Sequence, residues 1–366
     1  DDGIVNNIKD NTIIVDHTTA SADIARKYYK KAKECNFSFL DAPVSGGQAG
    51  AENGILSIMI GGDEKAYKIV AKDLEKASAK GVKGKPCCSY LGDRGAGHFV
   101  KIIHNGIEYA EMQLIAEIYE ILRRSKKTNE EIANFFDNLK EENRSSYLIE
   151  ITSKILRQKK DEVYVLDEIK PFASNKGTGK LTVETSLNLK VPTPSIYAAY
   201  DARVQSNNKN DWEEINIESE ITSEIDLSNC LYFGRVASMI QGLELIAKHM
   251  VNIDFGIVLN NWMGGCIIRS NLLKELNVVS SASKDFLGDL KLNKIFKDNL
   301  VSTKKIISEA VLNDISTPVL SASLNWYLNL SSSSNPSNLI QAQRDFFGRH
   351  KVQLVDSEED VNIDWD

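Results

Sequence analysis

The N-terminal part of the chain, up to about residue 90, alternates short apolar runs with segments of helical periodicity. Strands are predicted at residues 12–15, 37–44 and 55–60. The first of these runs is β-branched, ends at Asp16 and is predicted to be buried. Two helices are predicted: one over residues 20–36, with Ile24, Tyr28 and Ala32 on one face, and one after Asp63, which is a favourable N-cap residue. This order of elements is typical of doubly wound α/β structure.

After Gly95 the strand signals almost vanish, and the remaining pattern is mainly helical. Helices are predicted at residues 98–124, 129–139, 145–157, 231–250 and 300–313. Residues 331–334, followed by Asn335 and Pro336, are typical of a linker. The segment 339–366 is too short to form its own hydrophobic core, so we expect it to dock on another surface. The sequence therefore predicts an α/β domain (1–93), a helical domain (94–332) and a C-terminal tail (333–366).

A dinucleotide-binding α/β domain normally begins with a strand, a GxGxxG turn and a helix whose N-terminal amides hold the pyrophosphate. The sequence contains no GxGxxG, and its nearest matches, at residues 95–97 and 177–179, lack the third glycine. We interpret the α/β part as an incomplete doubly wound (Rossmann-like) domain whose first βαβ unit would precede Asp1. The alternative is a protein that uses no dinucleotide. On the first interpretation we expect the isolated chain not to turn over a substrate.

Composition narrows the class of protein. With 42% hydrophobic and 26% charged residues, the chain is predicted to fold. Its net charge of −7 gives no general attraction to nucleic acid or anionic lipid, so we expect neither nucleic acid nor a membrane as a partner. The five cysteines include no CxxC pair, which argues against a disulfide framework or a zinc site and favours a reducing compartment. No signal peptide or bilayer-spanning apolar run is present in the sequence.

Four polar residues in the predicted helix 98–124 could carry acid–base chemistry. Lys101, His104, Asn105 and Glu108 stand at i, i+3, i+4 and i+7, and so share one helix face. A lysine can act as a general base if burial lowers its pKa, and a carboxyl group can act as an acid if burial raises its pKa. The alternative is a solvated helix face.

Two glycine-containing segments could bind anions. Ser45, Gly46 and Gly47 follow a predicted strand, at the edge where open α/β sheets place their ligands. Lys176 and Thr178 lie in a loop, 176–180, that offers a cation, a hydroxyl and free amides but lacks the GxxxxGK[ST] spacing. The alternatives are an ordinary turn and a flexible surface loop.

Several other residues are interpreted as structural. Cys266 has no CxxC partner and is predicted to be a small buried residue rather than a nucleophile. His17, His98 and His249 are also predicted to be structural.

Four segments, in this order, together resemble the 6-phosphogluconate dehydrogenase family: GAGHFVKIIHNGIEYAEMQLIAE (95–117), NKGTGK (175–180), GGCIIRS (264–270) and LIQAQRDFFGRH (339–350). The resemblance covers the chain from about residue 86 to its end. It implies a cytoplasmic, metal-independent enzyme of the pentose phosphate pathway. The reaction it implies converts 6-phosphogluconate to ribulose 5-phosphate and CO2 while NADP is reduced.

The resemblance also implies roles for individual residues. Lys101 would be the base that takes the 3-hydroxyl proton, and Glu108 the acid that protonates C1 of the enediol. The carboxylate and hydroxyls of the substrate would be positioned by Ser45, Gly46, Gly47, His104 and Asn105. Its phosphate would be held by Tyr109, Lys176, Thr178 and Arg203, joined by Arg344 and His350 of the neighbouring subunit. The tail would thus be exchanged within an obligate homodimer.

The N-terminal stretch departs from that family. The family usually has Asp-Gly-Gly-Asn after the first strand present here, and its asparagine touches the nicotinamide; this chain has Thr19 at that position. Leu181 stands where a tryptophan commonly follows KGTGK. Residues 16–19 and 41–54 are more similar to the 3-hydroxyisobutyrate dehydrogenases. A hydroxyacid dehydrogenase of that type and a non-catalytic dimerising remnant are therefore the alternative functions.

Overall fold

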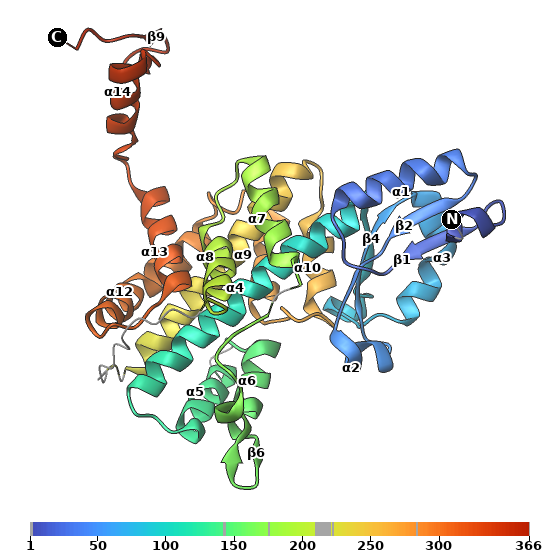
Figure 1. The fold of residues 1–366 in the computed structure, drawn as a ribbon, viewed down its shortest axis with the longest axis horizontal. Coiled ribbons are helices and arrows are strands. Elements are labelled where there is room, and N and C mark those ends of the chain that lie inside the picture. The colour runs from blue at the N-terminus through green and yellow to red at the C-terminus, as the bar shows by residue number, and fades with distance from the viewer. Residues whose placement is uncertain are drawn as a thin grey trace. The chain divides into compact units, whose positions relative to one another are not determined.

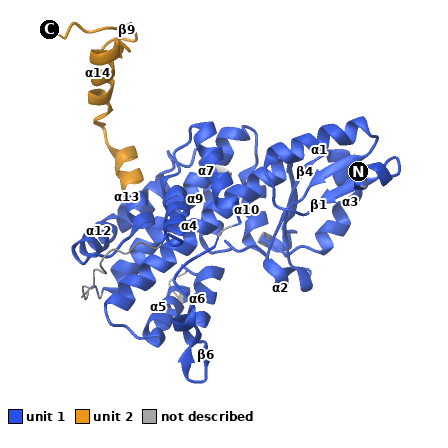
Figure 2. Ribbon diagram, in the orientation of Figure 1, with its two compact units in different colours: residues 1–324 blue, residues 325–366 orange. Residues whose placement is uncertain are grey.

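The computed structural model describes residues 3–141, 144–174, 176–208, 221, 223–282 and 285–365. Asn175, the first residue of the NKGTGK segment, lies outside them. The chain divides into two compact units, residues 1–324 and 325–366 (Figure 2). None of the helices in the described ranges is both long enough and apolar enough to span a membrane.

The first unit begins with a mixed sheet (Figure 1). Its strands are β1 (Ile13–Asp16), β2 (Ser38–Asp41), β3 (Val44–Ser45), β4 (Ser57–Gly62) and β5 (Cys88–Gly92). β1 is parallel to β2, and β4 is parallel to β5, but β4 runs antiparallel to both β2 and β3. The helices α1 (Ala22–Glu34) and α3 (Glu64–Lys76) lie on opposite faces of the sheet. The doubly wound α/β prediction is confirmed.

Details of this region differ from the predictions. The strand predicted at 37–44 is divided into β2 and β3; between them, Ala42 N donates to Asp16 O at 2.8 Å and Pro43 O accepts from Met59 N at 3.1 Å. β1 is only half-buried, and in the described chain it pairs only with β2. The helix predicted over residues 20–36 is confirmed as α1; on the face named for it, Ala32 is buried and Tyr28 stacks on Phe39 of β2, whereas Ile24 is 44% exposed. Strand β5 and the short helix α2 (Gly47–Glu52) were not predicted.

The helical prediction for the remainder is confirmed. Its bounds are α4 (Ala96–Arg124), α5 (Asn129–Glu141), α6 (Tyr147–Arg157), α7 (Thr178–Leu189), α8 (Pro194–Gln205), α9 (Glu224–His249), α10 (Phe255–Met263), α11 (Leu272–Ala282), α12 (Leu290–Leu312) and α13 (Pro318–Ser331). Short 3-10 turns lie at Ile4–Asn7, Val82–Gly84 and Val165–Glu168, and a hairpin pairs β6 (Lys159–Lys160) with β7 (Val163–Tyr164). Helices α7, α8, α10, α11 and α13, and the tail helix at Ser337–Gly348, were not predicted from the periodicity.

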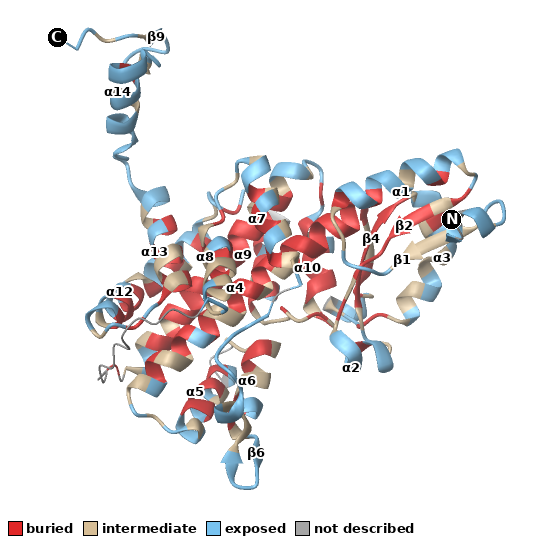
Figure 3. Ribbon diagram, viewed as in Figure 1, coloured by how far each residue is buried: buried red, intermediate tan, exposed pale blue. Residues whose placement is uncertain are grey.

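The long helices α4 and α9 pack together and form the buried centre of the first unit (Figure 3). Glu111 of α4 and Arg235 of α9 are buried there, with Oε1 and Nε 3.6 Å apart. Glu117, also on α4, accepts hydrogen bonds from the backbone amides of Val319 and Leu320, at the start of α13, at 2.9 and 3.0 Å. Burial raises the pKa of Glu117 to about 7, although these hydrogen bonds oppose the shift. Polar groups of α4 therefore take part in packing along most of its length.

The second unit carries α14 (Ser337–Gly348), β8 (Val352–Gln353) and β9 (Asp360–Val361). Asp345 is the one buried residue of α14, and its carboxylate accepts hydrogen bonds from Lys351 N, Ile363 N and Trp365 Nε1 at 2.8–3.0 Å. The large apolar side chains of α14 are exposed: Phe346 and Phe347 are 68% and 73% exposed. A buried carboxylate, rather than a hydrophobic core, thus organises this unit.

A second buried carboxylate fixes the beginning of α4. Asp41, at the end of β2, accepts hydrogen bonds from the backbone amides of Gly95 and His98 at 3.2 and 2.8 Å. These amides have no partner within the helix, so the carboxylate acts as a cap supplied by the sheet. Burial raises the pKa of Asp41 to about 6, although the hydrogen bonds from α4 oppose the shift.

The raised pKa of Asp41 predicts a pH effect on stability. A carboxyl group whose pKa is higher in the folded chain stabilises the fold most when protonated, so its contribution falls between about pH 4 and pH 6. The asparagine side chain of the Asp41→Asn variant is neutral over this whole pH interval. The free energy of unfolding of the variant should therefore rise relative to the parent chain over that interval, by on the order of 2–3 kcal/mol.

Urea unfolding from pH 4 to pH 7 measures this difference. Asp23→Asn, at an exposed aspartate paired with Arg26, is the control and should show no comparable trend. A difference that moves the opposite way would mean that the hydrogen bonds, not burial, dominate at Asp41.

Candidate active site

Both glycines in the turn after β3 adopt positive φ angles. Gly46 has a φ of 135°, and a Cβ atom there would lie 2.6 Å from the carbonyl oxygen of Gly265. Gly47 has a φ of 66° and open space around it. The segment 264–270 therefore packs directly against the Ser45–Gly47 turn, although the two are more than 200 positions apart in sequence.

Ser45 joins three segments. Its Oγ accepts a hydrogen bond from Ile267 N at 3.3 Å and lies 3.3 Å from Nε2 of His104 on α4. The serine is buried, as is His104. The strand end, the central helix and the 264–270 segment thus meet at one hydroxyl group.

The polar face predicted on α4 surrounds the ring of His104. Nδ1 of this ring lies 3.4 Å from Nζ of Lys101, 3.1 Å from Oδ1 of Asn105 and 3.7 Å from Oε2 of Glu108. The edge of the ring meets Trp262 of α10, with centroids 5.9 Å apart. Since Lys101 and His104 are buried, the alternative of a solvated helix face is wrong.

Burial shifts the titration of this cluster. It lowers the pKa of Lys101, with Glu108 opposing, and it lowers the pKa of His104 well below the ordinary value, with Lys101 adding to the effect. Burial raises the pKa of Glu108, with Lys101 and Arg203 opposing. A neutral amine and a protonated carboxyl group are therefore both accessible nearer neutral pH than they are in water, as acid–base catalysis requires.

A cationic corner lies next to Glu108. The guanidinium of Arg203, on α8, lies 3.6 Å from the centroid of the Tyr109 ring. The same ring packs against Gly179 in the first turn of α7, where a Cβ atom would lie 2.6 Å from a ring carbon. Thr178 opens that helix and is half-buried, and Lys176 just before it is exposed. The structure thus brings Tyr109, Thr178 and Arg203 close to the α4 cluster.

The other predicted residues are placed less closely. Thr19 is exposed in the loop after β1, with α1 beginning three residues later. Arg344 and His350 belong to the second unit, which is described by itself. Cys266 is buried, as predicted, and burial raises its pKa to about 12, which disfavours the thiolate.

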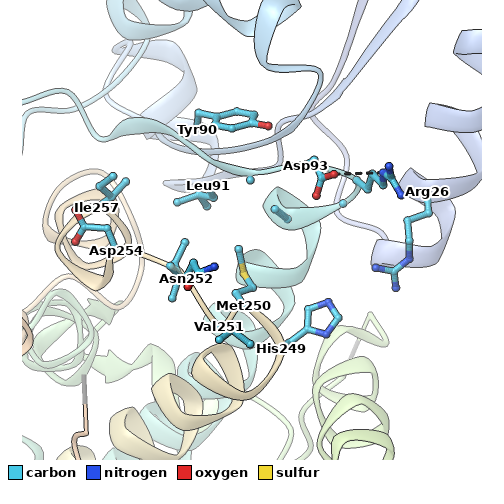
Figure 4. A pocket seen from close by; sticks show the side chains of 15 residues that line it. Arg26, Tyr90, Leu91, Asp93, His249, Met250, Val251, Asn252, Asp254 and Ile257 are labelled. Carbon is cyan, nitrogen blue, oxygen red and sulfur yellow. Dashed lines mark ion pairs between the residues drawn. The ribbon is translucent and has the colours of Figure 1, made fainter. Parts of the chain in front are cut away.

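A separate pocket lies at the N-terminal end of α4 (Figure 4). It is lined by side chains that include Arg26, Tyr90, Asp93, His249 and Asp254. None of the predicted site residues lines it.

Comparison with known proteins agrees with this geometry. Residues 97–365 match the profile "6-phosphogluconate dehydrogenase, C-terminal domain", and residues 1–92 match "NAD binding domain of 6-phosphogluconate dehydrogenase". The chain belongs to the 6-phosphogluconate dehydrogenase family. The N-terminal stretch, with its likeness to 3-hydroxyisobutyrate dehydrogenases, thus matches the profile of the same family.

Individual members of the 6-phosphogluconate dehydrogenase family are similar over most of the chain. The decarboxylating enzyme of Lactococcus lactis subsp. lactis is 38% identical, over 91% of this chain and 75% of its own length. That of Escherichia coli is 35% identical, over 98% of this chain and 80% of its own. The Plasmodium falciparum structure is 34% identical with a TM-score of 0.90, over 99% of this chain and 82% of that one.

Some supporting residues of the candidate site were not singled out from sequence. Gly265 and Ile267 contact the Ser45–Gly47 turn, Trp262 packs against the His104 ring, and Asp41 caps α4. Gly265 and Ile267 lie in the quoted GGCIIRS motif, which could have indicated them. The roles of Asp41 and Trp262 depend on contacts between distant segments, and no local pattern predicts those.

The two glycines of the turn give a matched pair of variants. Gly46→Ala should cost about 3 kcal/mol of unfolding free energy, because the new methyl group meets the Gly265 carbonyl in a strained conformation. Gly47→Ala has free space and should cost only the left-handed backbone penalty, about 1–2 kcal/mol. Urea unfolding of both variants measures the gap, and equal losses would show that Gly265 yields.

Proposed function

We propose that this chain carries the catalytic site for oxidative decarboxylation of 6-phosphogluconate to ribulose 5-phosphate and CO2, with reduction of NADP. The observation that carries the proposal is the buried cluster on α4, in which Lys101 and Glu108 both lie within 3.7 Å of the His104 ring. The similar Plasmodium falciparum structure is described in complex with NADP+ and with 6-phosphogluconate. The cluster provides the base and the acid that this reaction needs.

Lys101 is the base in this proposal. In its neutral form, which burial favours, Nζ accepts the proton of the substrate 3-hydroxyl as hydride leaves C3. The resulting 3-keto acid loses C1 as CO2, and the electron pair of the broken C1–C2 bond forms the C2–C3 double bond of an enediol as protonated Lys101 returns its proton to the C3 oxygen. Glu108, whose carboxyl group burial favours as the protonated form, then donates a proton to the former C2, which becomes C1 of ribulose 5-phosphate, while Lys101 takes the C3 hydroxyl proton again. Ser45, His104 and Asn105 orient the carboxylate and hydroxyls of the sugar acid.

The phosphate of the substrate belongs at the cationic corner. The guanidinium of Arg203 lies over the Tyr109 ring, which also contacts Gly179, the residue after Thr178, and Lys176 is exposed just before this turn. A small hydroxy acid without a phosphate would need no such group of cations. This corner therefore favours the sugar phosphate over 3-hydroxyisobutyrate, whose dehydrogenases the 16–19 segment resembles.

The described residues fit the nicotinamide end of the cofactor. The exposed loop that carries Thr18 and Thr19 follows the carboxyl end of β1, where α/β sheets bind ligands, and β1 ends beside the first turn of α4. NADP, when bound, accepts the hydride from C3. The sequence has no GxGxxG turn for the pyrophosphate, so we assign to this chain only Thr19 and its loop.

We also propose a cytoplasmic location and a place in the pentose phosphate pathway. All five cysteines are free thiols, and four of them are buried, as expected for a protein of a reducing compartment.

Replacement of the base tests the reaction. Lys101→Met should lower turnover on the order of 10³-fold, since a positioned base contributes about that much. Affinity for 6-phosphogluconate should change much less, because the ligands of the phosphate remain. Lys68→Met, at an exposed lysine paired with Glu64, is the control and should leave both unchanged.

Calorimetry with the 366-residue chain measures 6-phosphogluconate binding. Absorbance of reduced nicotinamide, with NADP and then NAD, measures turnover in the chain and in a form extended upstream by a GxGxxG unit. Turnover of 3-hydroxyisobutyrate but not of 6-phosphogluconate would refute the proposed substrate. Binding of 6-phosphogluconate without turnover in the extended form would indicate the non-catalytic protein.

We further propose a homodimer in which the tails are exchanged, so that Arg344 and His350 complete the partner's phosphate site. The support is the second unit itself, because Phe346 and Phe347 of α14 are largely exposed in it and a soluble surface rarely leaves such residues bare.

Subunit mixing tests the exchange. Lys101→Met and Arg344→Ala should each be nearly inactive alone. In a mixed dimer with exchanged tails, one site keeps both residues, so equimolar mixing should restore about one quarter of full turnover for random reassortment of a two-fold dimer. If each tail served its own subunit, every site would keep one defect and mixing would restore nothing.

A further inference from the structure

Two parallel strands end side by side on aspartates that face the first turn of α4. Asp16 and Asp41 are register partners at the ends of β1 and β2. Asp41 binds the backbone of α4 through the amides of Gly95 and His98. Asp16 faces a side chain of the same turn, since its Oδ2 lies 3.5 Å from Nε2 of His98. His98 is thus approached from both strands.

The ring of His98 is fully buried, and neither of its nitrogens makes a hydrogen bond within the described part of the chain. The 3.5 Å contact with Asp16 exceeds the usual N–H···O range of about 2.7–3.2 Å. A buried polar group without a partner is costly, so its presence calls for a physical reason. Burial lowers the pKa of His98, with Asp16 opposing, so the ring is neutral at pH 7 and has one N–H to offer.

The pair lies between the two halves of the proposed reaction site. Asp16 is the residue at which the loop that carries Thr19 begins. Its Oδ1 accepts a hydrogen bond from the amide of Thr18 at 2.9 Å. His98 precedes Lys101 by three residues, so both lie on one side of α4 a single turn apart. A hydrogen bond from His98 Nε2–H to Asp16 would therefore tie the nicotinamide loop to the helix that carries the base.

We propose that Asp16 and His98 form a positioning pair that fixes the 17–19 loop relative to Lys101 and so aligns the nicotinamide with C3 of the substrate. The inference rests on the proposed function for the roles of Thr19 and Lys101. Alignment matters because the reacting atoms must approach to about 3–3.5 Å, and displacements near 1 Å cost large factors in rate. His98 is a positioning residue, since the groups proposed to bind the sugar acid are others.

Two substitutions at one position separate the hydrogen bond from simple packing. His98→Phe keeps a planar ring in the buried site but removes both nitrogens. His98→Gln keeps an N–H that can reach toward Asp16. His249→Phe is the matched control. The ring of His249 stacks on Phe99, the residue after His98 on α4, with centroids 4.2 Å apart, and His249 lines the pocket of Figure 4.

The first readout needs no ligand. Amide hydrogen exchange in the 366-residue chain should show the 17–19 amides exchanging about tenfold faster in His98→Phe, because the proposed pair closes its 3.5 Å contact to a charge-assisted hydrogen bond and the variant cannot. His98→Gln should stay within about twofold of the parent chain, as should His249→Phe. Unchanged exchange in His98→Phe would refute the pair, whatever the chain binds or catalyses.

The second readout separates positioning from general damage to α4. In the upstream-extended form, His98→Phe should raise the KM for NADP about tenfold and lower kcat, while calorimetric affinity for 6-phosphogluconate stays within about twofold. Partial rescue of both kinetic parameters in His98→Gln is expected. An equal loss of 6-phosphogluconate affinity would show that His98 only supports the helix and would overturn the proposal. Failure of the parent form to turn over 6-phosphogluconate would count against the proposed function, while the exchange result would still decide the pair.

Discussion

The cost of burying charge governs this fold. Helix α4 carries Lys101, His104, Glu108, Glu111 and Glu117 in or at the edge of the protein interior, and an isolated charge there would be expensive. Each of these groups is given a polar neighbour by a different segment or by the helix itself: Arg235 of α9 meets Glu111, the start of α13 meets Glu117, and the ring of His104 lies between Lys101 and Glu108. The surrounding helices must therefore hold particular orientations toward α4.

The sheet also supplies polar partners to α4, at the N-terminal end of the helix. Asp41 receives the first amides of α4, while Ser45, four residues later, reaches the ring of His104. One short stretch of chain thus contacts both the beginning of α4 and the part of it that carries the proposed catalytic residues. Ile267 donates to the same Ser45 hydroxyl, which explains why a segment so distant in sequence carries a recognisable motif.

The sequence alone predicts a large part of this arrangement. The i, i+3, i+4, i+7 spacing places Lys101 and Glu108 on one helix face, and the helix exists as expected. Spacing could not show that this face is buried, because the covering residues, such as Trp262, come from other helices. Helices α7 and α8 show no clear apolar periodicity because most of their buried residues are small or polar, as are Gly179, Thr182 and Ser186 in α7. The buried residues of α1 are alanines, which carry little hydrophobic signal, so periodicity could not show that Ile24 is largely exposed.

The stacking of Arg203 on Tyr109 has a consequence for selectivity among anions. A guanidinium already held against a ring has lost most of its rotamer freedom during folding, whereas an exposed lysine such as Lys176 keeps that freedom until a ligand arrives. Ordering a long side chain on binding costs about 0.5–1.5 kcal/mol. Arg203 avoids most of this entropy loss and presents a planar fork in a fixed direction. In the proposed phosphate site the two cations would therefore differ: Arg203 would discriminate among anions by shape, and Lys176 would add charge without a fixed direction.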